Sequence, residues 1–333
     1  MQPNVFRRIV LGAIGAAVGV AALLSTAPTM AQGNYPSKPI TIVVAYPAGG
    51  DTDVLARLMA EKLAARLKQS VVVENRTGAA GTIGSAYVAR AAADGYTLLL
   101  APNTVSIAPL VLKAGTGASY DVLNDLTPIA QLGTQSLFVV VNKNSGISRM
   151  SDLVARAKAG KLETYATPGN GSPMHIMGEL FNKSANVKIA QVPYRGTAPA
   201  IVDVLGGQVP MTYVTYGAVA QYVGNGTLVP LAVADARRSP FAPNVPTLAE
   251  LGYKDVEIGA WQALLGPKNL SPEIVRMLNG HVNEILKQPD VVARMATIAV
   301  TPVGGEPAVL QKLIAADYAR YARLVKEFGI QAD

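Results

Sequence analysis

Cysteine is absent from this chain of 333 residues. Its absence excludes disulfide bonds, thiolate metal sites, iron–sulfur clusters and a cysteine nucleophile. It also excludes a lipid-modified N-terminal cysteine. Histidine is scarce, because only His175 and His281 occur, and the sequence therefore argues against a multi-histidine metal site. We predict a protein that uses neither a metal nor a cofactor.

Charged and aromatic residues are also few, at 15% and 6%, whereas hydrophobic residues make up 50% of the chain. Disordered proteins are richer in charge and poorer in hydrophobic residues, so we expect a folded chain with a large core. The net charge is +7, but the basic residues are dispersed and lack interleaved aromatic residues. Nucleic-acid binding is therefore not expected.

Motifs of the common enzyme classes are missing as well. The sequence has no GxxxxGKS or GxxxxGKT, HExxH or GxSxG motif. Gly169 and Gly171 begin a dinucleotide-binding pattern, but Met174 stands at the place of its third glycine. Asp51 and Asp53 have carboxylates suited to acid–base catalysis, yet aspartate in the first turn of a helix is also ordinary stabilisation. We predict that the protein is not an enzyme.

The first residues have the pattern of an export signal. Arg7 and Arg8 precede an uncharged run at residues 9–24, and Ala31 ends a small-x-small cleavage pattern. An uncleaved membrane anchor is the alternative, but the run is shorter than the usual span of about 20 residues. We predict that a signal peptide, residues 1–31, is removed, and no later apolar run is long enough for a membrane span. A cysteine-free exported chain fits the periplasm of a Gram-negative bacterium.

Strand-like and helix-like segments alternate along the remaining chain. Residues 39–45 form a short β-branched run, as in strands buried on both faces, and residues 52–67 have the apolar stripe of a helix. This alternation predicts parallel sheets with helices on both faces, in two α/β domains. The predicted domains comprise residues 32–134 with 255–333, and residues 135–254. Further strands are expected at residues 71–73, 96–101, 137–141, 164–167, 187–193, 209–214, 229–234 and 256–265, and helices at residues 83–92, 150–159, 173–181, 198–205, 272–286, 289–296 and 307–326.

Three glycine-containing loops follow predicted strands and open predicted helices, at residues 46–53, 167–172 and 193–197. Helix N-termini offer unpaired N–H groups that favour an anion, and glycine lets a ligand approach the backbone closely. Tight turns in α/β proteins need glycine without any ligand, so one such loop is weak evidence. Three loops at the strand ends of two α/β units predict a cleft that binds a carboxylate or phosphate.

Longer stretches of the sequence are more specific. They are YPSKPITIVVAYPAGGDTDVLARLMAEKL from residue 35, VVVENRTGAAGTIGSAYVARAAADGYTLLL from residue 71, ATPGNGSPMH at 166–175, QVPYRGTAPAIVDVLGGQV at 191–209 and RRSPFAPNVPTLAELGY at 237–253. Together and in this order they resemble the Bug receptors, the periplasmic solute-binding proteins of tripartite tricarboxylate transporters. The resemblance covers essentially the whole chain after the signal peptide. It implies a two-domain periplasmic-binding-protein fold of type II (Venus flytrap), with a ligand cleft between the domains.

The same resemblance implies ligand-binding positions in both domains. Residues 46–50 and Asp53 would hold one carboxylate through backbone amides and ordered waters, beside a wall formed by Asn103, Thr104 and Ser106. Residues 167–175 and 194–198 would form the opposing jaw. The ligand-binding residues predicted in this way are Tyr46, Pro47, Ala48, Gly49, Gly50, Asp53, Asn103, Thr104, Thr167, Gly169, Gly171, Ser172, His175, Arg195, Gly196, Thr197, Ala198 and Tyr213.

One segment departs from the Bug pattern. After Gly-Gly-Gln-Val the family often has an aspartate and then a Phe-Asp pair, whereas this chain has Pro210 and Val214 in the corresponding run. An ammonium group needs a carboxylate near it, so we expect a ligand without an amine. Tyr213 and Tyr216 either line a pocket for an aromatic or longer carboxylate or pack between the sheet and a helix.

Two further side chains have alternative interpretations. His175 either orients a ligand or caps and packs the helix that it begins, and Trp261 is either core or a ligand platform. We predict a monomeric receptor that binds an amine-free di- or tricarboxylate, aliphatic or aromatic, and delivers it to a tripartite tricarboxylate transporter permease. The alternative is a co-receptor that presents the bound carboxylate to a sensor kinase.

Overall fold

The computed structural model describes residues 35–111 and 119–331. The predicted signal peptide, residues 1–31, lies outside the described residues. From Lys38 onward the chain forms one compact unit, to which all elements named below belong. Within the described ranges, no helix combines the length and the apolar character needed to cross a bilayer.

Within the described residues, ten strands form one hydrogen-bonded network in the order β2-β1-β3-β9-β4-β7-β5-β6, with β10 and β8 also paired to β4. The strands are β1 (Ile40–Val44), β2 (Val71–Asn75), β3 (Thr97–Pro102), β4 (Leu126–Asn142), β5 (Thr164–Thr167), β6 (Ala190–Pro193), β7 (Met211–Thr215), β8 (Leu228–Val233), β9 (Gly259–Pro267) and β10 (Thr301–Pro302).

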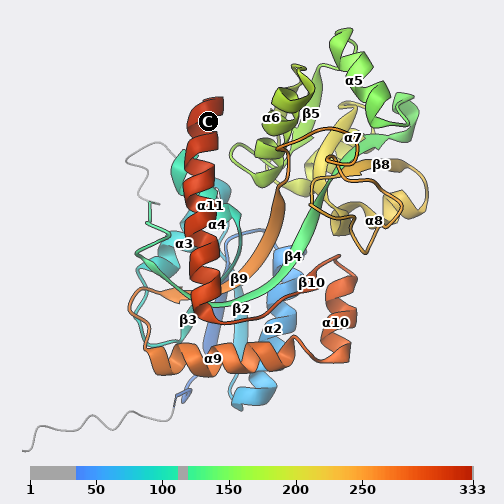
Figure 1. Cartoon of the computed structure of the whole chain (residues 1–333). Helices are drawn as coiled ribbons and strands as arrows, with labels where there is room; N and C mark the ends of the chain where they lie inside the picture. The colour runs from blue at the N-terminus through green and yellow to red at the C-terminus, as the bar shows by residue number, and fades with distance from the viewer. Residues whose placement is uncertain (1–34, 112–118, 332–333) are drawn as a thin grey trace, which may run out of the picture. The chain divides into compact units, whose positions relative to one another are not determined.

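Strand β4 joins two segments of this sheet. Its residues 126–136 pair antiparallel with β9, and residues 137–142 pair antiparallel with β7 and β8. We call β2-β1-β3-β9-β4 with β10 the first sheet segment, and β4-β7-β5-β6 with β8 the second sheet segment. Figure 1 shows β4 and β9 running from one segment toward the other.

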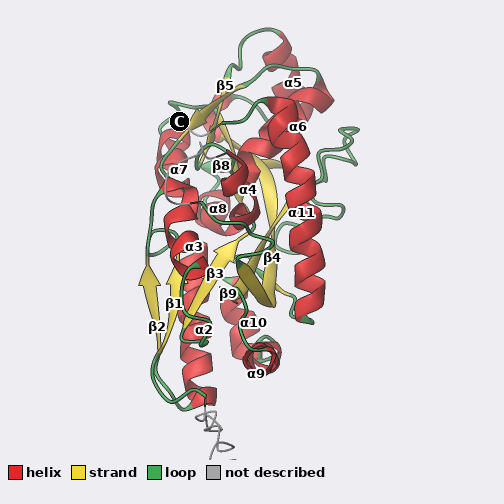
Figure 2. Ribbon diagram, turned by 90° about the vertical axis from the view of Figure 1, so that its left-hand side faces the viewer, coloured by secondary structure: helices red, strands yellow, loops and turns green. Residues whose placement is uncertain are grey.

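Helices cover both faces of the sheet, as Figure 2 shows. On the first sheet segment, α2 and α9 contact each other on one face, while α3, α4 and α11 pack on the opposite face. The helices are α2 (Asp51–Leu67), α3 (Thr82–Ala89), α4 (Thr104–Val111), α5 (Met150–Lys158), α6 (Pro173–Ala185), α7 (Thr197–Leu205), α8 (Tyr216–Gly224), α9 (Pro272–Ile285), α10 (Pro289–Ala296) and α11 (Pro307–Phe328), with short 3₁₀ turns at Ala79–Gly81 and Lys143–Ser145.

Alternate residues of β4 build the two cores of the second sheet segment. Val139 belongs to the cluster that contains Phe181 of α6, whereas Val140 belongs to the cluster that contains Val204 of α7. Each of these side chains is fully buried, which is the period of two expected for a strand covered on both faces. Tyr321 and Val325 of α11 also join the α6 cluster, so the C-terminal helix packs on both sheet segments.

The alternation of strands and helices confirms the predicted α/β class, with three corrections. The sheet is mixed rather than purely parallel, because β4 and β9 run antiparallel to their neighbours. The strand predicted at residues 137–141 is the end of the much longer β4. Helices α4 and α8 were not predicted: α4 contains Pro109, which usually ends a helix, and each follows its strand almost directly.

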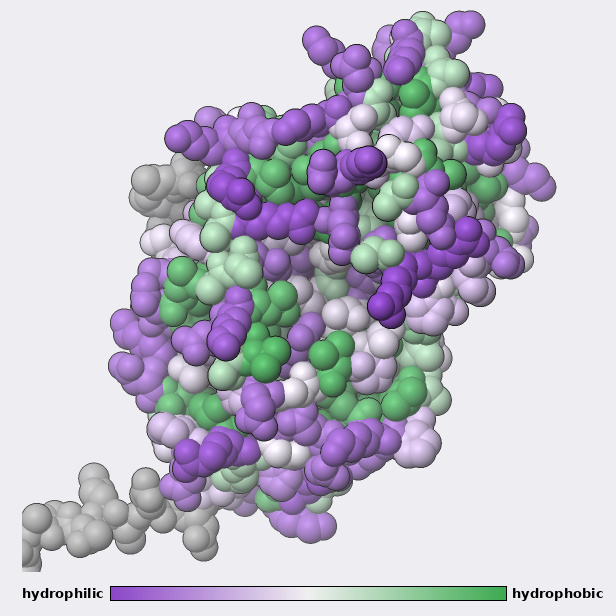
Figure 3. Space-filling model, in the orientation of Figure 1, coloured by the Kyte–Doolittle hydropathy of each residue, from purple (hydrophilic) through white to green (hydrophobic). Residues whose placement is uncertain are grey.

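Surface polarity agrees with the dispersed charges of the sequence. On the face seen in Figure 3, hydrophobic residues lie in small groups between hydrophilic ones. The predicted division into residues 32–134 with 255–333, and residues 135–254, stays a prediction.

Candidate functional site

The carboxyl ends of the parallel strands place the predicted loops in two groups. β1 is parallel to β3, so residues 46–50 and residues 103–106 follow strands that end at one edge of the first sheet segment. β5 is parallel to β6 and β7, so residues 168–172 and 194–196 lie at one edge of the second sheet segment. These edges are where open α/β sheets bind ligands.

Two contacts bring the edges together. The Thr215 hydroxyl, at the end of β7, lies 3.1 Å from the Asp51 carboxylate at the start of α2. Gly171 lies against Val111 at the end of α4, so closely that a Cβ on Gly171 would stand 2.8 Å from a methyl group of that valine. The loops of the two sheet segments therefore lie at one junction.

The loop after β1, residues 46–50, is mostly exposed and is held by contacts with α2 and with the 3₁₀ turn Ala79–Gly81. Pro47, Ala48, Gly49 and Gly50 are exposed. Gly49 has φ +85° and donates its N–H to Asp53 Oδ2 at 2.9 Å. This turn needs glycine because the left-handed region is unfavourable for residues with a Cβ.

Tyr46, the first residue of the same loop, attaches it to the 3₁₀ turn Ala79–Gly81. Its hydroxyl donates to the Ala80 carbonyl at 3.3 Å, and its ring lies so close to Gly81 that a Cβ there would stand 2.7 Å from the hydroxyl oxygen. The Tyr46 ring therefore packs against this 3₁₀ turn.

Asp53 is turned inward and supports the loop. Its carboxylate accepts from Arg57 Nε and Nη2, each at 3.0 Å, and from Asn75 Nδ2 at 2.9 Å. Burial raises the pKa of Asp53, but the hydrogen bonds from Arg57, from the Gly49 N–H and from Asn75 outweigh it, and the net pKa is lowered. Asp53 is thus an ionised brace for the loop.

Asn103 and Ser106 of the predicted wall are completely buried, whereas Thr104 is half-buried. Asn103 Nδ2 donates to the Gly259 carbonyl at 3.0 Å and to the Tyr321 hydroxyl at 3.1 Å. Asn103 Oδ1 and Ser106 Oγ have no partner among the described residues. Asn103 therefore ties β3 to β9 and α11.

The loop after β5 is held by the helix that follows it. Ser172 is the N-cap of α6 and accepts the His175 N–H at 3.2 Å, and Gly171, with φ +68°, donates its N–H to His175 Nδ1 at 3.2 Å. Thr167, at the strand end, is buried and accepts from Gln191 Nε2 at 2.5 Å. Gly169 is half-buried, with φ +139°.

His175 is buried and neutral. Burial lowers its pKa to about 4. Because Nδ1 accepts the Gly171 N–H, the proton of the neutral ring lies on Nε2, which faces Glu179 Oε1 at 3.8 Å. Glu179 in turn accepts from the Tyr165 hydroxyl at 2.8 Å. His175 thus caps and packs the first turn of α6, and its contact with a ligand stays a prediction.

The loop after β6 extends the same edge. Tyr194 donates its N–H to the Thr167 carbonyl, and Gly196, with φ +114°, donates to the Pro168 carbonyl. Arg195 and Ala198 are exposed, and Thr197 is half-buried.

Tyr213 lies in the core of the second sheet segment. Its side chain is fully buried between Tyr165, with ring centroids 5.0 Å apart, and Phe181, at 6.5 Å, and its hydroxyl has no partner among the described residues. Tyr216 is half-buried against Phe138. The structure thus shows the packing alternative for both tyrosines. Trp261 is buried too and donates its indole N–H to Asp317 at 2.7 Å.

A chain of polar side chains at the junction was not predictable from the sequence. Asp51 Oδ2 accepts from Gln135 Nε2 at 2.8 Å, Gln262 Nε2 donates to Gln135 Oε1 at 3.1 Å, and the Thr52 hydroxyl lies 3.3 Å from Gln262 Oε1. With Thr215, it connects α2, β4, β9 and β7. The sequence presents Asp51 either as an acid–base carboxylate or as a first-turn aspartate, and no sequence signal links it to glutamines more than eighty residues away.

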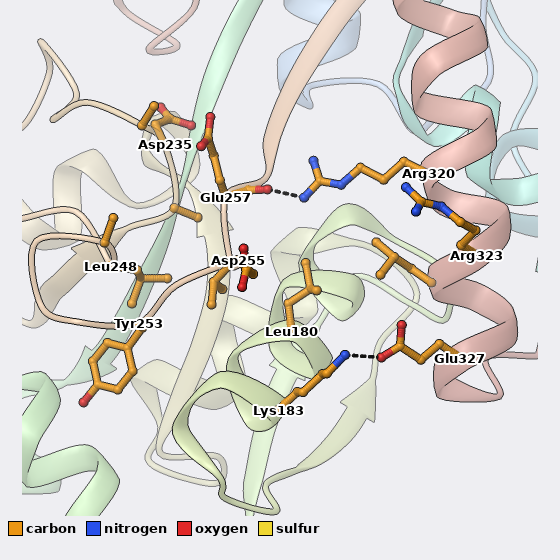
Figure 4. Close-up of a pocket in the computed structure, with 15 residues that line it drawn as sticks. Leu180, Lys183, Asp235, Leu248, Tyr253, Asp255, Glu257, Arg320, Arg323 and Glu327 are labelled. Carbon is orange, nitrogen blue, oxygen red and sulfur yellow. Dashed lines mark hydrogen bonds and ion pairs between the residues drawn. The ribbon is translucent and has the colours of Figure 1, made fainter.

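A pocket of about 760 Å³ lies elsewhere, beside the C-terminal half of α11. In Figure 4, Arg320 and Arg323 project from α11 toward Glu257 and Asp255, and Lys183 pairs with Glu327. None of the predicted ligand-binding residues lines this pocket. Over the described ranges, no cluster of three or more histidine, aspartate or glutamate side chains is arranged to hold a metal ion.

Comparison with known proteins identifies the family. The model of the tripartite tricarboxylate transporter family receptor matches residues 55–330. The chain belongs to this receptor family. BugT of Bordetella pertussis is 38% identical over 321 residues, which cover 96% of each chain.

Solved structures of receptors agree with this assignment. The periplasmic binding protein BugD is 31% identical, with a TM-score of 0.80 over 90% of this chain and 100% of that one. Rpa4515 of R. palustris, solved with adipate, is 32% identical, with a TM-score of 0.83 over the same shares. MatC from Rhodopseudomonas palustris, solved with malate, is 28% identical, with a TM-score of 0.79 over 87% of this chain and 100% of that one.

The family assignment settles three predictions. It confirms the resemblance to the Bug receptors and the periplasmic-binding-protein fold. It also confirms that this receptor is a solute-binding protein and not an enzyme. The predicted ligand-binding residues stay predictions.

Proposed function

We propose that this receptor captures a small amine-free di- or tricarboxylate between two closing domains and delivers it to the permease of a tripartite tricarboxylate transporter. The domains are residues 32–134 with 255–333, and residues 135–254. Each would bind one end of the ligand, so binding energy would favour the closed state.

Two uncapped helix N-termini carry this proposal. The N-cap residue of α2 is Gly50 and that of α7 is Gly196, and neither helix receives a side-chain capping hydrogen bond. The first N–H groups of such helices lack intrahelical acceptors, and the helix dipole adds positive potential there. One such end lies on each sheet segment, which suits an elongated dianion with a carboxylate at each end.

The solved relatives support the ligand class. The structures with adipate and with malate each hold a dicarboxylate without an ammonium group. The chain itself offers Pro210 and Val214 where an ammonium-binding acid would be expected, and Val214 is buried among apolar side chains. Ordered waters between the loops and the ligand would allow ligands of different lengths.

The cellular setting follows from the same proposal. Residues 1–31 would direct export and be removed, leaving a monomeric receptor in the periplasm of a Gram-negative bacterium. No observation on the described residues favours presentation to a sensor kinase. Loss of carboxylate uptake in a deletion strain would support delivery to a permease, whereas normal uptake with a lost transcriptional response would contradict it.

A thermal-shift screen of the purified mature protein tests the ligand class. The panel holds C4–C6 dicarboxylates, citrate, aromatic carboxylates and acidic amino acids. A ligand at 100 times its Kd stabilises a one-site receptor by about 2.7 kcal/mol, which gives a readily measured shift. Stabilisation by amine-free carboxylates is expected. Stabilisation by amino acids alone would contradict the amine-free ligand, and no stabilisation by any member would contradict the carboxylate proposal.

A further inference from the structure

Asp51 presents one carboxylate oxygen beside the proposed carboxylate site. It is the first residue of α2 and follows the exposed Gly50 directly. Its Oδ2 is occupied, because Gln135 Nε2 donates to it at 2.8 Å and the Thr215 hydroxyl lies 3.1 Å away. Both partners are buried, with Gln135 3% and Thr215 7% exposed. The carboxylate is therefore anchored through one oxygen.

The other oxygen of Asp51 is free. Oδ1 has no hydrogen-bond partner among the described residues, and it is not one of the buried unpartnered atoms, so it remains accessible to solvent. No ion pair among the described residues includes Asp51. Burial raises the pKa of Asp51, while the hydrogen bonds with Gln135 and Thr215 lower it by less. Asp51 Oδ1 is thus a hydrogen-bond acceptor at the junction with no cation paired to it.

Further hydrogen bonds fix the direction in which Asp51 points. Gln262 Nε2 donates to Gln135 Oε1 at 3.1 Å, so the Gln135 amide has its oxygen occupied and its nitrogen left to donate to Asp51. Gln262 Oε1 in turn lies 3.3 Å from the Thr52 hydroxyl. Each side chain in this series of hydrogen bonds orients the next one. The Asp51 carboxylate therefore cannot rotate freely.

We propose that Asp51 is a specificity-determining residue: its Oδ1 accepts a hydrogen bond from a hydroxyl group on the carbon next to the ligand carboxylate held by residues 46–50. The preferred ligand is then a 2-hydroxy di- or tricarboxylate. This inference rests on the proposed function, because it assumes that residues 46–50 hold a carboxylate.

A hydroxylated ligand is preferred because a hydrogen-bond acceptor that loses its water and gains no partner raises the free energy of the complex. A ligand that closes the junction removes water from Oδ1, and a bare methylene group there leaves a charged acceptor without a partner. A hydroxyl group replaces the lost water and satisfies the oxygen. Sites built to hydrogen-bond a hydroxyl reject the analogue that lacks it more strongly than apolar sites discriminate between methylene groups.

Matched ligand pairs measure this preference by calorimetric titration of the mature protein. Malate is compared with succinate, and citrate with tricarballylate, since each pair differs by one hydroxyl. The wild-type protein is expected to bind the hydroxylated member of the accepted pair about ten- to a hundredfold more tightly. In Asp51→Ala, the ratio is expected to fall to about threefold or less.

Val54→Ala is the matched control. Val54 lies in the same helical turn and is half-buried, but its apolar side chain takes no part in the polar chain that orients Asp51. A general disturbance of the α2 N-terminus lowers both affinities together, so the ratio in this variant should stay at the wild-type value. A ratio that is lost equally in both variants would overturn the role of Asp51.

The outcomes separate this inference from the proposed function. Equal wild-type affinities for the two members of a pair would overturn the hydroxyl preference and leave a carboxylate receptor. Tighter binding of aspartate than of malate would overturn the hydroxyl assignment together with the amine-free ligand. Binding of no carboxylate at all would overturn the proposed function itself.

Discussion

The loops after β1 and β5 are stabilised by the same hydrogen-bond pattern, but the accepting side chains differ. In each, a glycine with positive φ donates its N–H to a side chain four residues later, on the first turn of the following helix. Gly49 donates to Asp53 Oδ2 at 2.9 Å, and Gly171 donates to His175 Nδ1 at 3.2 Å. Each glycine thereby fixes the shape of the loop from within.

The acceptors differ in charge and in support. Asp53 is ionised and is braced by Arg57, whose guanidinium is largely exposed, so the first loop depends on local contacts near the surface. His175 is neutral, and Glu179 and Tyr165 stand behind it in the core. Changes in the first loop should therefore disturb the fold little. The second loop is coupled to core packing and, through Gly171, to Val111 of α4.

Gly49→Val breaks the first loop and should give the largest effect on binding. The φ of +85° is unfavourable for valine, but a Cβ at this position meets no atom within 4 Å. We expect a loss of stability of about 1–3 kcal/mol from the strained backbone. Carboxylate binding should disappear, because the branched side chain prevents close approach to the backbone N–H groups. Thermal unfolding and ligand titration measure the two effects separately.

Gly160→Val is the control for this prediction. Gly160 has φ +64° and equally open surroundings, but it follows α5 and is not one of the predicted ligand-binding residues. It should lose similar stability and bind normally. Normal binding by Gly49→Val would show that residues 46–50 do not hold the ligand.

The sequence predicted the elements around both loops well, because their signals are local. Residues 164–167 form β5 as expected, and Ser172 before Pro173 caps α6. The capping preference and the fixed φ of proline act within one turn, so they are visible without the fold.

The tertiary connections of the site were not predictable in the same way. Sequence alone left Tyr213 either at the ligand or in the core, and only the pairing of β5 with β7 places it beside Tyr165. The Asp51–Gln135 hydrogen bond joins residues from α2 and β4 that no periodicity relates. Long-range polar contacts depend on the packing of several elements at once, which composition and spacing do not encode.

His175 makes the second loop sensitive to acid. Its pKa of about 4 in the folded protein lies below the usual 6.5, so the unfolded chain binds more protons between these values. Its contribution is complete above pH 6.5 and is lost as the pH falls toward 4, by up to about 3 kcal/mol. Urea unfolding at pH 7.0 and at pH 4.5 measures this loss.

His175→Asn separates this contribution from other titrating groups. The Asn Oδ1 keeps an acceptor near the place of Nδ1 but does not titrate in this range. Burial raises the pKa of Asp235 to about 6, so its contribution grows as the pH falls, opposite to that of His175, and it is the same in both proteins. The wild-type protein should lose more stability than the variant between the two pH values. An equal loss would mean that His175 is not the acid-sensitive group of the second loop.

Tyr165→Phe removes the last support behind His175 and should have the smallest effect. The lost hydroxyl donates to Glu179 at 2.8 Å, and loss of this hydrogen bond should cost about 1–2 kcal/mol of unfolding free energy. Tyr213→Phe is the matched control, because its ring lies 5.0 Å from that of Tyr165, but its buried hydroxyl has no partner among the described residues. Deleting an unpaired buried hydroxyl removes a desolvation cost, so that variant should be as stable as the wild type or slightly more stable. Equal destabilisation of the two variants in urea would show that the Tyr165–Glu179 hydrogen bond contributes nothing specific. The second loop would then depend on packing alone.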